Sequence, residues 1–97
     1  MNSIDIAKKL VEENNSDIED SRRAEKIILQ RIAQYEKDIE KYEKYEKYEK
    51  FIKIKKRALA AAKTDLQRKR DQRKERHLDN VALRMFIADC DGLDTLD

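Results

Sequence analysis

Residues 42–50 read YEKYEKYEK, a repeated triplet of tyrosine, glutamate and lysine. Each glutamate of the surrounding triplets has a lysine four positions later, as Glu43 has Lys47. Such pairs meet on one side of a helix and stabilise it by about 0.2–0.5 kcal/mol each. Glutamate and lysine also favour helices, and the chain has no proline and a single glycine, Gly92. The repeat therefore predicts an uninterrupted helix.

Apolar residues before the repeat follow the spacing of a helix that packs on another helix. Ile28, Ile32, Tyr35, Ile39 and Tyr42 are separated by steps of four, three, four and three. The steps average about 3.5 residues, which is typical of a left-handed coiled coil. This apolar stripe needs a partner helix to cover it.

The spacing changes within the repeat, because the apolar residues from Tyr42 to Ile54 come at steps of three and move around the helix. A second stripe, Ile52, Leu59 and Leu66, repeats at seven in a different register. Either one continuous helix offers different faces to different partners, or the chain turns near residues 44–50 and forms a hairpin. Because this stretch contains no Gly, Pro, Asn or Ser, we expect the continuous helix.

Signals for helix ends lie on both sides of this long helix. Ser3 can cap a first helix, and Asn14-Asn15-Ser16 interrupts it before a new helix begins. Towards the other end, Asp79 or Asn80 can cap the last helix, and Asp91-Gly92 is expected to stop it. The expected elements are a short amphipathic helix over 3–14, a long helix over 16–77 with a basic arm over 50–76, an amphipathic helix over 78–90 and an acidic tail over 91–97.

These elements predict an all-α fold in a single helical unit over residues 1–97. Its long central helix forms a coiled coil, or a helical hairpin, with short amphipathic helices at both ends. The composition agrees, because 45% of the 97 residues are charged and little material is left for a globular core.

Composition also limits the classes of function. The single cysteine, Cys90, and the single histidine, His77, exclude an internal disulfide and a four-ligand Cys/His metal site. The sequence shows no glycine-rich phosphate loop and no catalytic constellation. We therefore expect a protein that is not an enzyme, uses no cofactor and binds no metal. It has no apolar run of about 20 residues, so we expect no membrane partner and a cytoplasmic (intracellular) location.

Positive charge is concentrated in one block. The net charge is −3 over residues 1–49 (10 basic, 13 acidic), +9 over 50–76 (12 basic, 3 acidic) and −4 over 77–97 (1 basic, 5 acidic). A basic helix can bind phosphate without reading the base sequence. The alternative is that the block pairs with acids of a neighbouring chain, such as those of residues 17–25. The candidate nucleic-acid-binding residues are Lys63, Arg68, Lys69, Arg70, Arg73, Lys74 and Arg76.

Two hypotheses of function follow. The first is a non-enzymatic coiled-coil accessory protein that engages nucleic acid, or a protein complex bound to it, through the basic arm. The second is a protein–protein interaction module, such as an adaptor, an assembly scaffold or an inhibitor of a larger enzyme. In both, the chain is expected to be a homodimer with a further protein partner. The candidate oligomerisation residues are Ile28, Ile32, Tyr35, Ile39, Tyr42, Ile52, Leu59 and Leu66, and the candidate partner-binding residues are Leu78, Val81, Met85 and Phe86.

Overall fold

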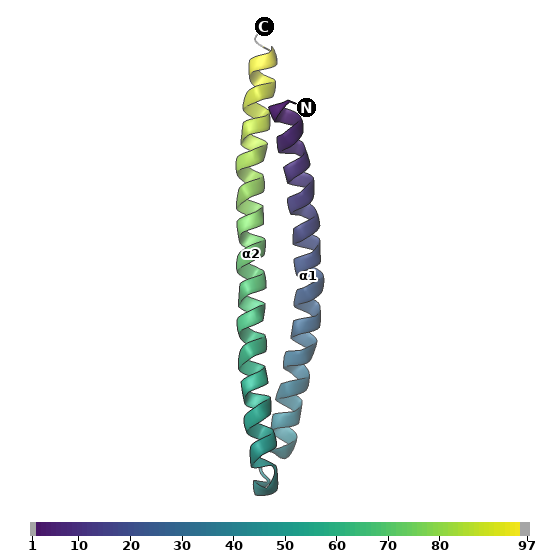
Figure 1. The fold of residues 1–97 in the computed structure, drawn as a ribbon, viewed down its shortest axis with the longest axis vertical. Coiled ribbons are helices and arrows are strands. Elements are labelled where there is room, and N and C mark those ends of the chain that lie inside the picture. The colour runs from purple at the N-terminus through teal and green to yellow at the C-terminus, as the bar shows by residue number, and fades with distance from the viewer. Residues whose placement is uncertain (1, 96–97) are drawn as a thin grey trace. The chain divides into compact units, whose positions relative to one another are not determined.

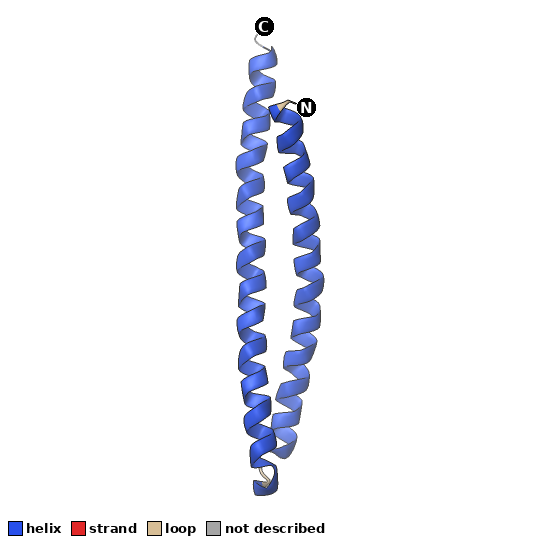
Figure 2. Cartoon of the chain, in the orientation of Figure 1, coloured by secondary structure: helices blue, strands red, loops and turns tan. Residues whose placement is uncertain are grey.

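The computed structural model describes the backbone of residues 2–95 and the side chains of residues 2–90. The all-α prediction is confirmed: α1 spans Ser3–Tyr42, a short 3₁₀ helix, η1, spans Glu46–Tyr48, and α2 spans Glu49–Thr95 (Figure 2). Two compact units can be distinguished, and each is described by itself. The turn unit comprises Arg22–Arg70, and the terminal unit comprises Met1–Ser21 and Asp71–Asp97.

The turn unit is a helical hairpin, so the continuous helix expected through residues 44–50 is wrong. Tyr45 has an extended backbone (φ −110°, ψ 117°), and η1 follows it before α2 begins. The end of α1 and the start of α2 lie side by side at this turn (Figure 1), where Lys55 Nζ is 3.3 Å from Asp38 Oδ2. The hairpin that the sequence offered as the alternative is therefore the observed fold of this unit.

Burial of apolar side chains explains why the chain turns without a glycine or proline. Interrupting the helix loses a few Glu–Lys pairs at about 0.2–0.5 kcal/mol each. Turning back lets Ile28 and Ile32 of the first stripe pack with Leu66 of the second, and Leu59 and Ala62 pack against them. Each large apolar side chain that becomes buried contributes about 1.5–3 kcal/mol, so burial outweighs the lost pairs.

In the terminal unit, the start of α1 lies beside the end of α2 (Figure 1). Asn2, one residue before the predicted cap Ser3, caps α1: its Oδ1 accepts a hydrogen bond from the backbone N–H of Asp5 at 2.9 Å. The interruption expected at Asn14-Asn15-Ser16 is wrong, because α1 is continuous through it. Asn14 is buried, and both Asn14 and Asn15 hydrogen-bond to Asn80 of α2. Because their side-chain amides are satisfied there, they do not compete for the backbone hydrogen bonds of α1.

The helix α2 likewise continues through positions where the sequence suggested helix ends. No helix begins at residue 78, because Asn80, a predicted cap, is instead buried against α1 at 2% exposure. The stop expected at Asp91-Gly92 is also wrong, since α2 continues to Thr95. Of the predicted acidic tail, only Leu96 and Asp97 lie beyond the residues whose backbone is described.

Buried and half-buried residues recur along each helix at alternating steps of three and four. We call the residues at this spacing the seam. All the seam positions of α1 and all but Arg76 of α2 are buried or half-buried. In α1 they are Ile4, Ala7, Val11, Asn14, Ile18, Ser21, Glu25, Ile28, Ile32, Tyr35, Ile39 and Tyr42; after the turn they are Tyr48 of η1 and, in α2, Ile52, Lys55, Leu59, Ala62, Leu66, Lys69, Arg73, Arg76, Asn80, Leu83, Ile87 and Cys90.

Candidate interaction surfaces

The basic segment, residues 50–76, is partly neutralised by acids of the same chain. In the turn unit, Arg70 Nε donates to Glu25 Oε1 at 2.9 Å, and the Glu25 side chain is only 14% exposed. In the terminal unit, Arg76 Nε lies 3.4 Å from Asp17 Oδ2. The sequence suggested acids of residues 17–25 as partners from a neighbouring chain; here two acids of that segment come from the chain itself.

Other members of the predicted nucleic-acid set divide between the seam and the surface. Lys69 and Arg73 are half-buried seam residues. Arg68 is exposed and pairs with Asp65, one turn before it, at 3.5 Å. Lys63 and Lys74 are also exposed. The structure therefore does not gather the seven predicted residues into one exposed basic surface.

A polar cluster interrupts the apolar seam of the terminal unit. Asn14 Nδ2 donates to Asn80 Oδ1 at 3.0 Å, and Asn80 Nδ2 donates to Asn15 Oδ1 at 3.0 Å. A buried amide on a helix–helix seam costs stability but favours the one register in which it finds its partner. Asn14 and Asn80 therefore select which residues of α1 and α2 face each other.

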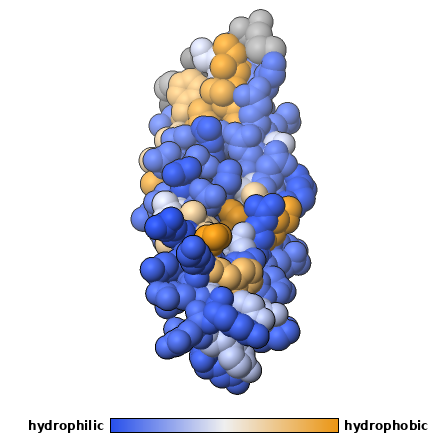
Figure 3. Space-filling model, turned by 60° about the horizontal axis from the view of Figure 1, so that its bottom comes forward, coloured by the Kyte–Doolittle hydropathy of each residue, from blue (hydrophilic) through white to orange (hydrophobic). Residues whose placement is uncertain are grey.

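The predicted partner-binding residues are exposed. We call Leu78, Val81, Met85 and Phe86 the outer face; their exposed fractions are 59%, 53%, 63% and 42%. Figure 3 shows apolar patches (orange) on an otherwise mostly hydrophilic surface, in the middle and near the upper end of the view. Ile6 and Leu10 of α1, at 47% and 42%, are exposed in the same terminal unit. Uncovered apolar side chains spaced along one helix make this face a candidate interaction surface.

The aromatic side chains of the repeat pack around the turn. The Tyr42 ring lies 4.8 Å from that of Tyr48 and 5.4 Å from that of Phe51, measured between centroids. Lysines cover ring faces as well, with Lys44 Nζ 5.7 Å from the Tyr45 centroid and Lys47 Nζ 5.1 Å from that of Tyr48. These contacts occupy ring faces that a nucleobase would need for stacking.

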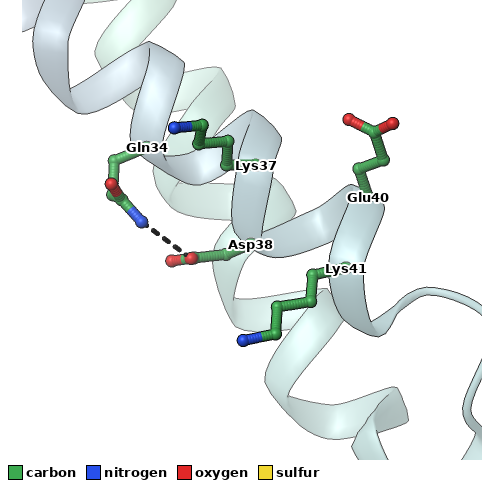
Figure 4. A pocket seen from close by; sticks show the side chains of 5 residues that line it. All are labelled: Gln34, Lys37, Asp38, Glu40 and Lys41. Carbon is green, nitrogen blue, oxygen red and sulfur yellow. Dashed lines mark hydrogen bonds between the residues drawn. The ribbon is translucent and has the colours of Figure 1, made fainter.

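A depression with polar walls lies on α1. Figure 4 shows that it is formed entirely by α1 residues, and that Gln34 Nε2 donates to Asp38 Oδ1 at 2.9 Å beside Lys37, Glu40 and Lys41. Its charges are balanced, and Asp38 is half-buried and paired with Lys55 of α2. Among the described residues, no three His, Cys, Asp or Glu side chains form a group that could hold a metal ion. No helix in the described part of the chain has both the length and the apolar character needed to cross a membrane.

Several predicted oligomerisation residues are covered within the chain. Ile28, Ile32 and Leu66 are buried in the turn unit, and Tyr42 packs on Tyr48. A second chain is not needed to cover these side chains, and their role in a homodimer stays a prediction. About half of the seam residues that the sequence did not place in the oligomerisation set are polar, such as Asn14, Glu25 and Asn80; the three–four spacing, which continues through them, was the signal that could have found them.

Comparisons with known proteins gave no match: no family model, no curated protein and no solved structure matches this chain. Its function must therefore be inferred from the geometry of its own residues.

Proposed function

We propose that this chain is a protein–protein interaction module: an antiparallel helical coiled coil that presents the outer face of α2 to a protein partner. The observation that supports this best is the exposure of Leu78, Val81, Met85 and Phe86 on a helix whose seam residues already pack within the chain. The spacing of the seam supports the coiled coil, because alternating steps of three and four keep one side of each helix facing its neighbour.

The energetics favour a partner that is itself apolar. Leu78 and Met85, at 59% and 63% exposure, keep much of their surface in water. Burying such a side chain fully is worth about 1.5–3 kcal/mol. An amphipathic helix laid along this face would contact residues one and two turns apart, which is how helix-in-groove recognition works.

The test replaces Met85 and Phe86 with serine and compares the proteins that wild type and variant capture, after cross-linking, in cells that produce the chain. The control replaces Ile54 with serine, because Ile54 is as exposed as Met85, at 63%, but lies in the turn unit. We expect the double variant to lose a protein that both wild type and control retain. Equal capture by all three would refute the proposal.

Nucleic-acid binding is the second candidate. It is supported by the +9 charge of residues 50–76 and by the exposure of Lys63, Arg68, Arg70 and Lys74. The pairs of Arg70 with Glu25 and of Arg76 with Asp17 weaken it, because a phosphate must compete with carboxylates already in place.

Titration with fluorescent single-stranded and duplex DNA and RNA, at low and near-physiological salt, tests this second candidate. If it holds, Arg70→Gln with Arg73→Gln and Lys74→Gln abolishes binding, and binding falls steeply with salt. Glu25→Gln is the matched control, since it breaks the Arg70 pair while leaving the positive charge. Binding that survives the triple variant would show that the site lies elsewhere.

A further inference from the structure

We infer that the outer face of α2 takes a second copy of the same chain, with the two α2 helices parallel. This inference rests on the proposed function, because it names the partner of the same surface. Three features support it: the spacing of the exposed apolar residues, their position relative to α1, and the charges along the two edges of the face.

The spacing is that of a second seam. Leu78, Val81, Met85 and Ala88 follow one another at steps of three, four and three, and all four are exposed. This alternation is what a parallel pair of helices needs over two heptads. A helix that carries one such seam for its own hairpin and another for a neighbour can pack with both at once.

The second seam points away from α1. Each of its residues precedes a buried or half-buried seam residue by two positions, as Leu78 precedes Asn80 and Met85 precedes Ile87. Two positions correspond to about 200° around an α-helix. The surface is therefore open to another chain without disturbing the Asn14–Asn80 contact.

The charges select the orientation. Arg84 lies along one edge of the exposed stripe, and Glu75 and Asp89 lie along the other. In a parallel pair, one edge of each helix lies against the opposite edge of the other. Arg84 of one copy therefore meets Asp89 of the other, five positions later, and the two-fold axis repeats this pair on the other side. Antiparallel helices would place Arg84 near the basic edge of the other copy. Both Arg84 and Asp89 are exposed, and neither forms an ion pair with another side chain in the described part of the chain.

Sedimentation equilibrium over a concentration series tests this pairing. We expect the wild-type mass to rise from monomer to dimer with concentration, and Arg84→Asp to weaken the dimer about tenfold. The double variant Arg84→Asp with Asp89→Arg should restore dimerisation, since the pair is reversed but intact. Arg57→Asp, an equal charge change in the turn unit, is the matched control and should leave the mass unchanged.

Cross-linking tests the orientation. In a Cys90→Ala background, Met85→Cys and Leu78→Cys should each form a disulfide between copies, because identical positions face each other along the whole of a parallel pair, whereas an antiparallel pair would separate Leu78 from its copy. Ala60→Cys, exposed in the turn unit, should not. Circular dichroism of each variant verifies that the helices are retained.

The outcomes separate this inference from the proposed function. A wild-type chain that stays monomeric, a double charge variant that does not recover, or a Met85→Cys or Leu78→Cys variant that does not cross-link overturns the parallel dimer. If the chain is monomeric but Met85→Ser with Phe86→Ser still loses a captured protein, only the second-copy inference fails. If the chain is monomeric and that capture is also unchanged, both fail.

Discussion

The two units bury different kinds of residues with the same seam spacing. The turn unit places Ile28, Ile32 and Leu66 together in an apolar cluster. The terminal unit buries Ile18 but also Asn14 and Asn80, and it leaves large apolar side chains such as Met85 exposed. Apolar seams contribute stability, whereas buried amides contribute register at some cost in stability. The turn unit therefore owes more of its stability to apolar burial, and the terminal unit carries the outer face that we propose binds a partner.

The largest expected effect comes from breaking the apolar cluster of the turn unit. Leu66→Ala should lower the free energy of unfolding by about 2–5 kcal/mol, because it leaves a cavity beside Ile28 and Ile32. Leu29→Ala is the matched control: Leu29 is 42% exposed, so its loss should cost about 0.5 kcal/mol or less. Urea unfolding followed by circular dichroism measures both, and equal costs would contradict the assignment of the core.

Breaking the asparagine cluster of the terminal unit should have the next largest effect. Asn80→Ala removes both the acceptor for Asn14 and the donor to Asn15, and should cost about 1–3 kcal/mol. Replacing Asn14 and Asn80 together with leucine should cost less than the sum of the single leucine replacements, because no unsatisfied amide remains between them. Additive costs in this double-mutant cycle would show that the two amides act independently.

A smaller effect is expected from the ion pair that neutralises part of the basic segment. Glu25→Gln should destabilise the chain by about 0.5–1 kcal/mol at low salt, since Arg70 is 47% exposed and its charge is screened. Asp65→Asn is the control, because Asp65 and Arg68 are both more than half exposed. In the same urea experiment at high salt, Glu25→Gln should lower the free energy of unfolding by less, because salt screens the ion pair. A loss of stability that does not depend on salt would argue against an electrostatic role.

The smallest effect on stability should come from the outer face. Met85→Ser should change the free energy of unfolding by about 0.5 kcal/mol or less when measured at low protein concentration, because the side chain is 63% exposed. The loss expected for Leu66→Ala is several times larger, because Leu66 lies in the core of the turn unit whereas Met85 is exposed in the terminal unit. A loss similar to that of Leu66→Ala would show that Met85 belongs to the core of the chain and not to a binding surface.

Apolar spacing predicted the part of the fold that depends on apolar residues. The stripe from Ile28 to Tyr42 and the stripe with Leu59 and Leu66 are both seam positions. The turn at Tyr45 was not predicted, because no residue there breaks a helix by itself. The chain turns because the two stripes bury each other, and that gain depends on contacts between residues far apart in the sequence.

Polar seam residues explain the other differences between sequence and structure. Asn14 and Asn80 look like helix ends in the sequence, because an amide competes with backbone hydrogen bonds unless another side chain satisfies it. Each satisfies the other across the two helices. The basic segment also has a distant partner that the sequence does not reveal. Counted along the sequence it has an excess of positive charge, but Arg70 donates to Glu25, which lies 45 positions away. The exposed outer face, by contrast, follows directly from its helical spacing.

The fold-back of the chain at Tyr45 is tested most directly by a distance within the turn unit. Gln30→Cys and Thr64→Cys place spin labels at exposed positions of α1 and α2, with Cys90→Ala removing the one native thiol and unlabelled chain added in excess. Helices packed as a hairpin predict a distance of about 20–30 Å between labels by pulsed electron paramagnetic resonance. A distance of about 50 Å, as along one continuous helix, would contradict the hairpin and every surface assigned from it.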